Sequence, residues 1–171
     1  KELVTRITNE LASRNITANI NEMYIGTFHS LCLRMLKEHL EYTRLRRNYR
    51  LMDSFDQQYM VFQNIHRFRS IPEIEIVLPN GGAWKQAETI CNFVNNLSEE
   101  LVSPEELMSD HDPSIASLGR MLQEYRTILT EANLMDFSSI QIEAYRLLCD
   151  NEGILNELRS AITHIMVDEY Q

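Results

Sequence analysis

The sequence predicts a mainly helical fold with one short strand near each end of the chain. Of 171 residues, 44% are hydrophobic and only 5 are glycine and 4 proline, which is typical of a folded domain built from long helices. Apolar residues recur at helical spacing through most of the chain. Two short apolar runs, residues 23–25 and 165–167, have instead the composition of buried strands.

Three helices are predicted in the first seventy residues. An amphipathic helix is expected over residues 3–11, before the first strand. Thr27 is placed to cap a second helix, over residues 28–42. The third begins near Ser54, because Ser54 and Gln57 have the spacing of a capping box.

The third helix carries an aromatic stripe that is predicted to lie in the core, formed by Phe55, Tyr59 and Phe62 and continued by Ile65 or His66. A loop follows over residues 70–83, where a proline stands at each end of an apolar stretch and two glycines come after it. Proline and glycine interrupt helices, so we expect this loop to separate two helical sub-bundles.

Helices are also predicted through the second half of the chain. Their expected starts are Trp84, Ser103 followed by Pro104, Asp112 followed by Pro113, Asp136, and about Ile154. The longest begins after Asp112 and ends near Asn133.

Charge is distributed unevenly along the chain. The net charge is −9, so the surface as a whole repels nucleic acid. Yet residues 1–70 hold 11 Lys and Arg against 7 Asp and Glu, whereas residues 71–171 hold 5 against 18. Any phosphate contact is expected in the first seventy residues, where the basic residues Arg44, Arg46, Arg47 and Arg50 cluster. On sequence grounds this cluster is either a solvated surface turn or a phosphate contact.

The cysteines and the apolar runs exclude several classes of protein. Cys32, Cys91 and Cys149 are odd in number and far apart, which suits free thiols rather than disulfides, and they do not form a set of zinc ligands. No apolar run approaches the roughly 20 residues that span a bilayer, and the first residues do not have the pattern of a signal peptide. A soluble, cytoplasmic protein that does not enter a membrane is expected.

Two adjacent carboxylates follow the second predicted strand. An apolar strand that ends in Asp168 and Glu169 suits nucleotide hydrolysis, in which one carboxylate holds Mg²⁺ and its neighbour activates a water molecule. The carboxyl end of a parallel strand opens onto the crevice where ligands bind. The same residues are also compatible with a strand that ends in a solvated turn.

Several motifs occur in a fixed order along the chain: ELVTRI at 2–7, GTFHSLCLRML at 26–36, LMDSFDQ at 51–57, NLMDF at 133–137 and IMVDEYQ at 165–171. In this order they resemble the UvrD/Rep/PcrA family of superfamily 1 DNA helicases. The resemblance covers the chain from end to end. It implies a protein that hydrolyses ATP with Mg²⁺ and unwinds DNA, with 3′ to 5′ polarity, in DNA repair or replication.

The resemblance also implies roles for individual residues. Asp168 would be the Mg²⁺ ligand, Glu169 the general base and Gln171 the last polar residue of the catalytic motif. Thr27, Phe28 and His29 would lie on the single-stranded DNA track, with Phe28 packed to fix the backbone and the His29 ring exposed to phosphate. Asp136 and Phe137 are expected to serve as helix cap and core anchor.

The chain departs from this family at one point. It contains no G-x-x-x-x-G-K-[ST] phosphate-binding loop, so we expect it neither to hold ATP tightly nor to hydrolyse it alone. We interpret residues 1–29 and 161–171 as remnants of the parallel α/β sheet of RecA-like domain 1A, and residues 30–160 as the helical bundle inserted into it, subdomain 1B. The partners of these 171 residues would be single-stranded and forked DNA and the rest of the helicase chain. The alternatives are a helicase-nuclease subunit or a stand-alone helical module that binds proteins.

Overall fold

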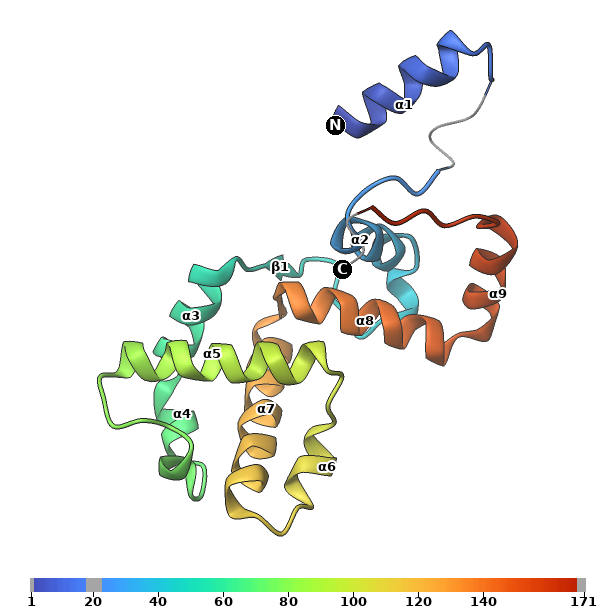
Figure 1. Cartoon of the computed structure of the whole chain (residues 1–171). Helices are drawn as coiled ribbons and strands as arrows, with labels where there is room; N and C mark the ends of the chain where they lie inside the picture. The colour runs from blue at the N-terminus through green and yellow to red at the C-terminus, as the bar shows by residue number, and fades with distance from the viewer. Residues whose placement is uncertain (1, 18–22, 169–171) are drawn as a thin grey trace.

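The computed structural model describes residues 2–17 and 23–168, and its helical content of 68% confirms the mainly helical prediction. The helices are α1 (Glu2–Ser13), α2 (Phe28–Glu38), α3 (Ser54–Gln63), α4 (Ile65–Arg69), α5 (Ala83–Glu99), α6 (Pro104–Met108), α7 (Pro113–Ala132), α8 (Phe137–Asp150) and α9 (Glu152–Ala161) (Figure 1). Two single 3₁₀ turns, η2 (Leu40–Tyr42) and η3 (Ile74–Ile76), lie between them.

The described strands lie in the middle of the chain and not near its ends. β1 (Arg50–Leu51) pairs in parallel with β2 (Leu134–Met135), in a register that sets Arg50 opposite Leu134. A backbone hydrogen bond of 2.8 Å from Met52 N to Met135 O closes the pair. This short ladder joins the segment before α3 to the segment between α7 and α8.

The strands predicted at residues 23–25 and 165–167 are wrong. Neither segment is a strand, because neither has a neighbouring strand among the described residues to pair its backbone groups. Residues 23–25 instead lie against α2, where the Arg34 guanidinium stacks 4.1 Å from the centre of the Tyr24 ring. The side chains of residues 165–167 are exposed, with Met166 95% accessible.

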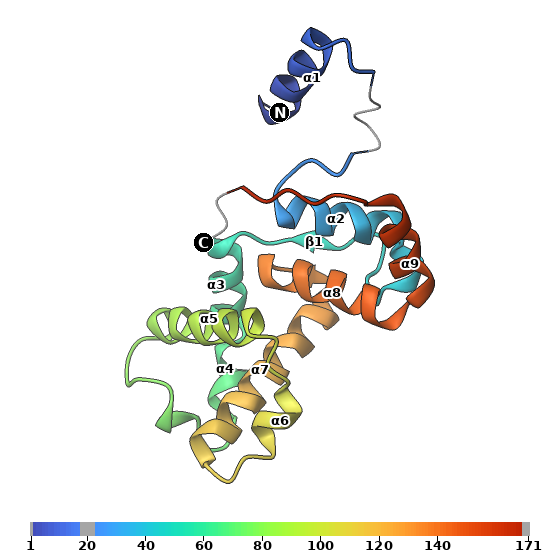
Figure 2. The same cartoon turned by 45° about the vertical axis from the view of Figure 1, so that its right-hand side comes forward.

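The core consists of two clusters of buried side chains. The first is built on α3, α4, α5 and α7 and includes Phe68, Ile90 and Leu122. The second is built on α2, α8 and α9 and includes Leu36 and Leu147. Figure 2 shows the two groups of helices side by side. The break between them falls at β2, where α7 ends and α8 begins.

The loop over residues 70–83 was predicted to separate two sub-bundles, and this is wrong. Ile74 and Leu78 are buried in the first cluster, to which α4 and α5, on either side of the loop, both belong. The apolar residues between the prolines fold back onto α7 through η3, so the loop is part of one core.

Most predicted helix starts are confirmed. Thr27, Ser103, Asp112 and Asp136 each accept a hydrogen bond from a backbone N–H in the first turn of the helix they precede. The capping box at Ser54 is wrong. Asp53 caps α3, accepting a bond of 2.8 Å from Asp56 N, and the side chain of Gln57 is buried.

The aromatic stripe of α3 is not in the core. Phe55, Tyr59 and Phe62 are 64%, 45% and 37% exposed. Met60 and Val61, on another face of α3, are buried in their place. α3 has apolar residues on two faces, and helical spacing alone does not tell which face meets the core.

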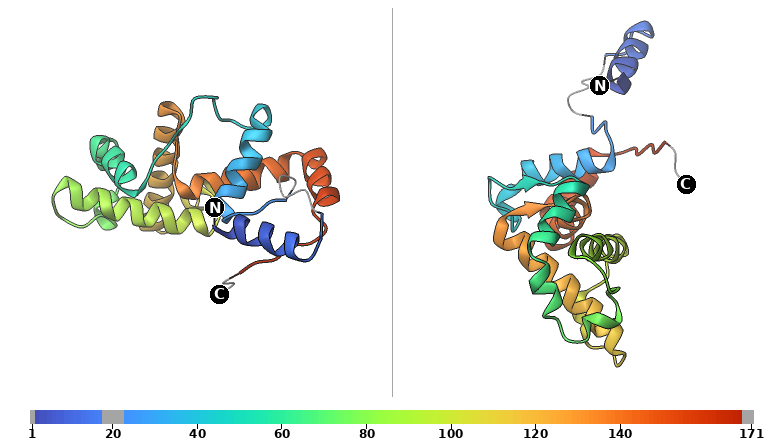
Figure 3. Two further views of the ribbon diagram at one scale, coloured as in Figure 1. Left: turned by 90° about the horizontal axis from the view of Figure 1, so that it is seen from above. Right: turned by 90° about the vertical axis from the view of Figure 1, so that its left-hand side faces the viewer.

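The predicted first helix is confirmed as α1, but it buries none of its residues. It stands clear of the two clusters in Figure 1 and in the right-hand view of Figure 3. Neither α1 nor any other helix in the described part of the chain is long and apolar enough to cross a membrane.

The three cysteines are free thiols. Cys91 is buried, and burial together with the charge of Asp136 raises the pKa of its thiol to about 12. Cys32 is half-buried, and Cys149 is exposed. The Cys91 thiol therefore stays protonated at neutral pH and behaves as a small core side chain.

Ser117 offers a test of the α7 packing. Its side chain is fully buried, and its hydroxyl has no hydrogen-bond partner in the described structure. We expect Ser117→Ala to leave the free energy of unfolding unchanged or to raise it by up to about 1 kcal/mol, because an unpaired buried hydroxyl is removed. Urea unfolding followed by circular dichroism measures this. A clear loss of stability would mean that the hydroxyl has a partner.

Candidate nucleic-acid interface

The first turns of α2 and α8 meet at one edge of the second cluster. Thr27 caps α2 and Asp136 caps α8. The ring of His29 stands edge-on to the ring of Phe137, with centroids 5.4 Å apart and planes at 87°. The GTFH motif and the NLMDF motif, more than one hundred residues apart in sequence, are therefore in direct contact.

Two phenylalanine rings at this edge face solvent. Phe28 is 61% exposed and Phe137 is 55% exposed, whereas His29 is half-buried. The predictions that Phe28 packs to fix the backbone and that Phe137 anchors the core are therefore wrong. Each ring belongs to the first residue of its helix, and the buried stripe of α8 begins one turn later, at Ile140.

The basic cluster lies on the segment that links η2 to β1, residues 44–50, which we call the arginine arm. It runs alongside the NLMDF motif: Arg46 N donates to Asn133 Oδ1 at 3.3 Å, and Arg50 N donates to Asn133 O at 3.1 Å. Asn133 adopts the left-handed conformation that ends α7. The NLMDF motif thus has the arginine arm beside its first residue and His29 against its last.

The arginines of the arm are available to a ligand. The side chains of Arg44, Arg46, Arg47 and Arg50 are exposed. None of them forms an ion pair with a carboxylate in the described part of the chain. Four arginines without a counter-charge among the described residues create a local positive potential on an acidic protein.

The structure does not bring the predicted catalytic residues together. Asp168 lies exposed at the end of the extended segment after α9, and Glu169 and Gln171 lie outside the described residues. Within residues 2–17 and 23–168, no three His, Cys, Asp or Glu side chains come together in a group that could hold a metal ion. The described donors therefore do not form a complete Mg²⁺ site, and these assignments stay predictions.

A buried polar network fixes the start of α8, and sequence reasoning did not foresee it. Gln57 Nε2 donates to Tyr125 Oη and to Asn95 Oδ1, each at 2.8 Å, and lies 3.3 Å from Asp136 Oδ2. The Tyr125 hydroxyl donates to Asp136 Oδ2. Burial and the neighbouring Asp136 carboxylate raise the pKa of Tyr125 well above its usual value. The only signal in the sequence was a polar Gln57 close to a capping residue.

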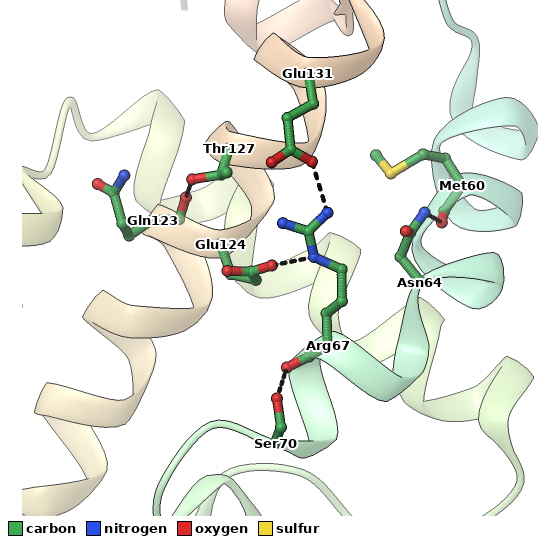
Figure 4. Close-up of polar contacts among 8 residues, drawn as sticks. All are labelled: Met60, Asn64, Arg67, Ser70, Gln123, Glu124, Thr127 and Glu131. Atoms are coloured by element: carbon green, nitrogen blue, oxygen red, sulfur yellow. Dashed lines mark hydrogen bonds and ion pairs between the residues drawn. The ribbon is translucent and has the colours of Figure 1, made fainter.

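An ion-pair network fixes α4 against α7. The Arg67 guanidinium bonds to Glu124, and its Nη1 lies 2.7 Å from Glu131 Oε2 (Figure 4). Beside it is a cavity of about 410 Å³ whose lining includes Arg50 of the arginine arm and Tyr59 of the exposed aromatic stripe. The arm and the stripe therefore border one depression in the surface.

The comparison with known families agrees with the order of the motifs. Residues 1–171 match the family described as "UvrD/REP helicase N-terminal domain". The chain belongs to this family.

Three relatives that match the chain are named as DNA helicases. The chain is 28% identical to the ATP-dependent DNA helicase SRS2 of Saccharomyces cerevisiae, over 99% of this chain and 16% of the relative. It is 29% identical to the probable DNA helicase II homolog of Mycoplasma capricolum, over 100% of this chain and 22% of the relative. It is 29% identical to DNA helicase II of Haemophilus influenzae, over 99% of this chain and 22% of the relative. The chain thus spans about a fifth of the length of these relatives.

Proposed function

We propose that this chain is part of an ATP-dependent DNA helicase of 3′ to 5′ polarity and that it supplies a binding surface for single-stranded DNA. The surface consists of the first turns of α2 and α8, with Thr27, Phe28, His29 and Phe137, together with the arginine arm. The observation that carries this proposal is the exposure of Phe28 and Phe137 together with an exposed arginine arm that contacts the first residue of the NLMDF motif.

The chemistry of these groups fits a single strand. An exposed aromatic ring offers a face on which a base stacks, which is worth about 1–3 kcal/mol per base. Exposed arginines contact phosphates and position the strand without reading its sequence. The N-terminus of α2, which is capped by the neutral side chain of Thr27, adds the positive end of its dipole. A stacking surface beside a basic segment is the arrangement that a single strand requires.

The catalytic part of the proposal concerns the longer helicase chain. There Asp168 would hold Mg²⁺, Glu169 would activate the water that attacks ATP, and Gln171 would complete the motif. Residues 30–160 would form the inserted subdomain 1B between two parts of domain 1A. The 171 residues alone contain no phosphate-binding loop motif and would not hydrolyse ATP.

A titration of fluorescently labelled single-stranded and forked DNA, followed by anisotropy over a range of salt, tests the surface. The variant with Arg44, Arg46, Arg47 and Arg50 all changed to Ala is expected to bind more weakly. If all four contact phosphates, the slope of log K against log salt becomes shallower by about 3, because each phosphate contact on a single strand contributes about 0.7.

Two further variants make this test specific. Changing Arg6, Arg14 and Arg159 to Ala removes positive charge from α1, from the residue that follows it and from α9, and should leave the salt slope as it is. Phe137→Ala should weaken binding about 5-fold to 100-fold with an unchanged slope, because it removes a stacking face and no charge. Equal affinity and equal slope for the four-arginine variant and the wild type would contradict the proposal and favour a module that binds proteins.

A further inference from the structure

Four aromatic rings on α3 and α5 form an exposed cluster, here called the aromatic quartet: Phe55, Tyr59, Phe62 and Trp84. Phe55 and Tyr59 are parallel within 3°, with centroids 6.3 Å apart, and Tyr59 and Phe62 are 6.4 Å apart. The Trp84 ring lies 5.9 Å from Phe55 and 5.6 Å from Phe62. Each ring therefore has aromatic neighbours, yet the four remain 37% to 64% exposed.

The quartet is not needed to complete the core. α3 buries Gln57, Met60 and Val61 on another face, and α5 contributes Ile90 and Val94 to the same first cluster. A group of large apolar side chains left on the surface marks a place where something binds. The quartet is also pre-ordered, because its rings hold one another in place, so a ligand that stacks on it loses little side-chain entropy.

The charge around the quartet indicates the class of ligand. The four arginines of the arm have no carboxylate partner among the described residues, whereas Arg67, farther along the chain, is paired with Glu124 and Glu131. Arg50, at the end of the arginine arm, lines the same cavity as Tyr59. A positively charged segment thus leads directly to a set of exposed ring faces. Arginines interleaved with aromatic rings suit a single-stranded nucleic acid, whose phosphates contact the arginines and whose bases stack on the rings.

We propose that the aromatic quartet is a second binding surface for single-stranded nucleic acid, on which bases stack on Tyr59, Phe62 and Trp84 while Arg50 contacts the phosphate that enters from the arginine arm. This goes beyond the surface proposed above, which uses the first turns of α2 and α8. It predicts that a strand continues past β1 and along α3 instead of ending at the arm.

Trp84 makes a direct test possible, because it is the only tryptophan in the chain. The 171-residue chain is titrated with a thymidine oligonucleotide of about 15 nucleotides, a length that covers the roughly 4–16 nucleotides typical of such sites. A matched abasic oligonucleotide provides the same phosphates without bases. We expect the thymidine strand to quench the Trp84 fluorescence and the abasic strand to leave it nearly unchanged.

Variants that keep Trp84 separate stacking from charge. Tyr59→Ala and Phe62→Ala should each weaken binding of the thymidine strand about 5-fold to 100-fold and reduce the quenching. Tyr145→Ala, which removes a tyrosine of similar exposure from α8, should change neither. Because all of these rings are exposed, thermal unfolding should show that the variants remain folded.

The outcomes distinguish this inference from the proposed function. Binding seen by anisotropy without quenching of Trp84 would overturn the quartet proposal and leave the α2 and α8 surface intact. Quenching that survives in the Phe137→Ala variant but disappears in Tyr59→Ala would support the quartet alone. Equal quenching by the abasic strand would overturn the quartet proposal. The absence of any binding would also overturn it and would point to a protein partner for these rings.

Discussion

Asp136→Ala is expected to lower the free energy of unfolding by about 2–4 kcal/mol. The substitution removes the N-cap of α8, which costs about 1 kcal/mol, and leaves the hydroxyl of Tyr125 buried without an acceptor, which costs about 1–3 kcal/mol more. Asp136 is only 4% exposed, so water does not readily take its place. Chemical unfolding of the wild type and the variant, followed by circular dichroism, measures the difference.

Asp112→Ala is the matched control for this prediction. Asp112 is also an aspartate that caps a helix, accepting from Ser114 N at 2.8 Å, but it is exposed and has no part in a buried network. The loss of stability in the Asp112→Ala variant should therefore be clearly smaller than the loss in Asp136→Ala. If the two variants lost equal stability, Asp136 would act as a cap only and the network would contribute nothing.

A double-mutant cycle isolates the bond between Tyr125 and Asp136. Tyr125→Phe alone removes the hydroxyl that donates to Asp136 and accepts from Gln57. In the Asp136→Ala background the same change removes an unpaired buried hydroxyl, so its cost should shrink or reverse. Strictly additive losses would mean that the two side chains do not interact energetically.

The helices could be predicted because their signals are local. Asp112, Pro113 and Asn133 mark the two ends of α7, and the structure places its boundaries there. The strands could not be predicted in this way. β1 and β2 are each two residues long and exist because Arg50 and Leu134 pair across more than eighty residues, which a local pattern does not encode.

The candidate site was predictable in its residues but not in its geometry. The order of the motifs selected Thr27, Phe28 and His29, but the contact of His29 with Phe137 depends on tertiary structure. The same limit explains why the exposure of the aromatic stripe of α3 was not predicted. Its spacing fits a core face and an exposed face equally well. Which apolar face is buried depends on the partners that α5 and α7 bring, and these come from distant parts of the chain.

Gly119→Ala is expected to destabilise the protein by up to about 2 kcal/mol, although alanine favours helices more than glycine. A methyl group at Gly119 in α7 would lie 2.7 Å from the backbone N of Met108 and 2.8 Å from the backbone O of Pro104. Backbone atoms of α6 cannot turn aside as the end of a side chain can, so the two helices must move apart. Overpacking of this kind costs about 1–3 kcal/mol, which exceeds the gain of about 1 kcal/mol in helix propensity.

Gly153→Ala in α9 separates these two effects. A methyl group there meets no atom within 4 Å, so only the gain in helix propensity remains and the variant should be slightly more stable than the wild type. Opposite signs for the two Gly→Ala changes in urea unfolding would show that the close approach of α6 to α7 requires a glycine. If Gly119→Ala were stabilising as well, α6 would have to shift freely on α7.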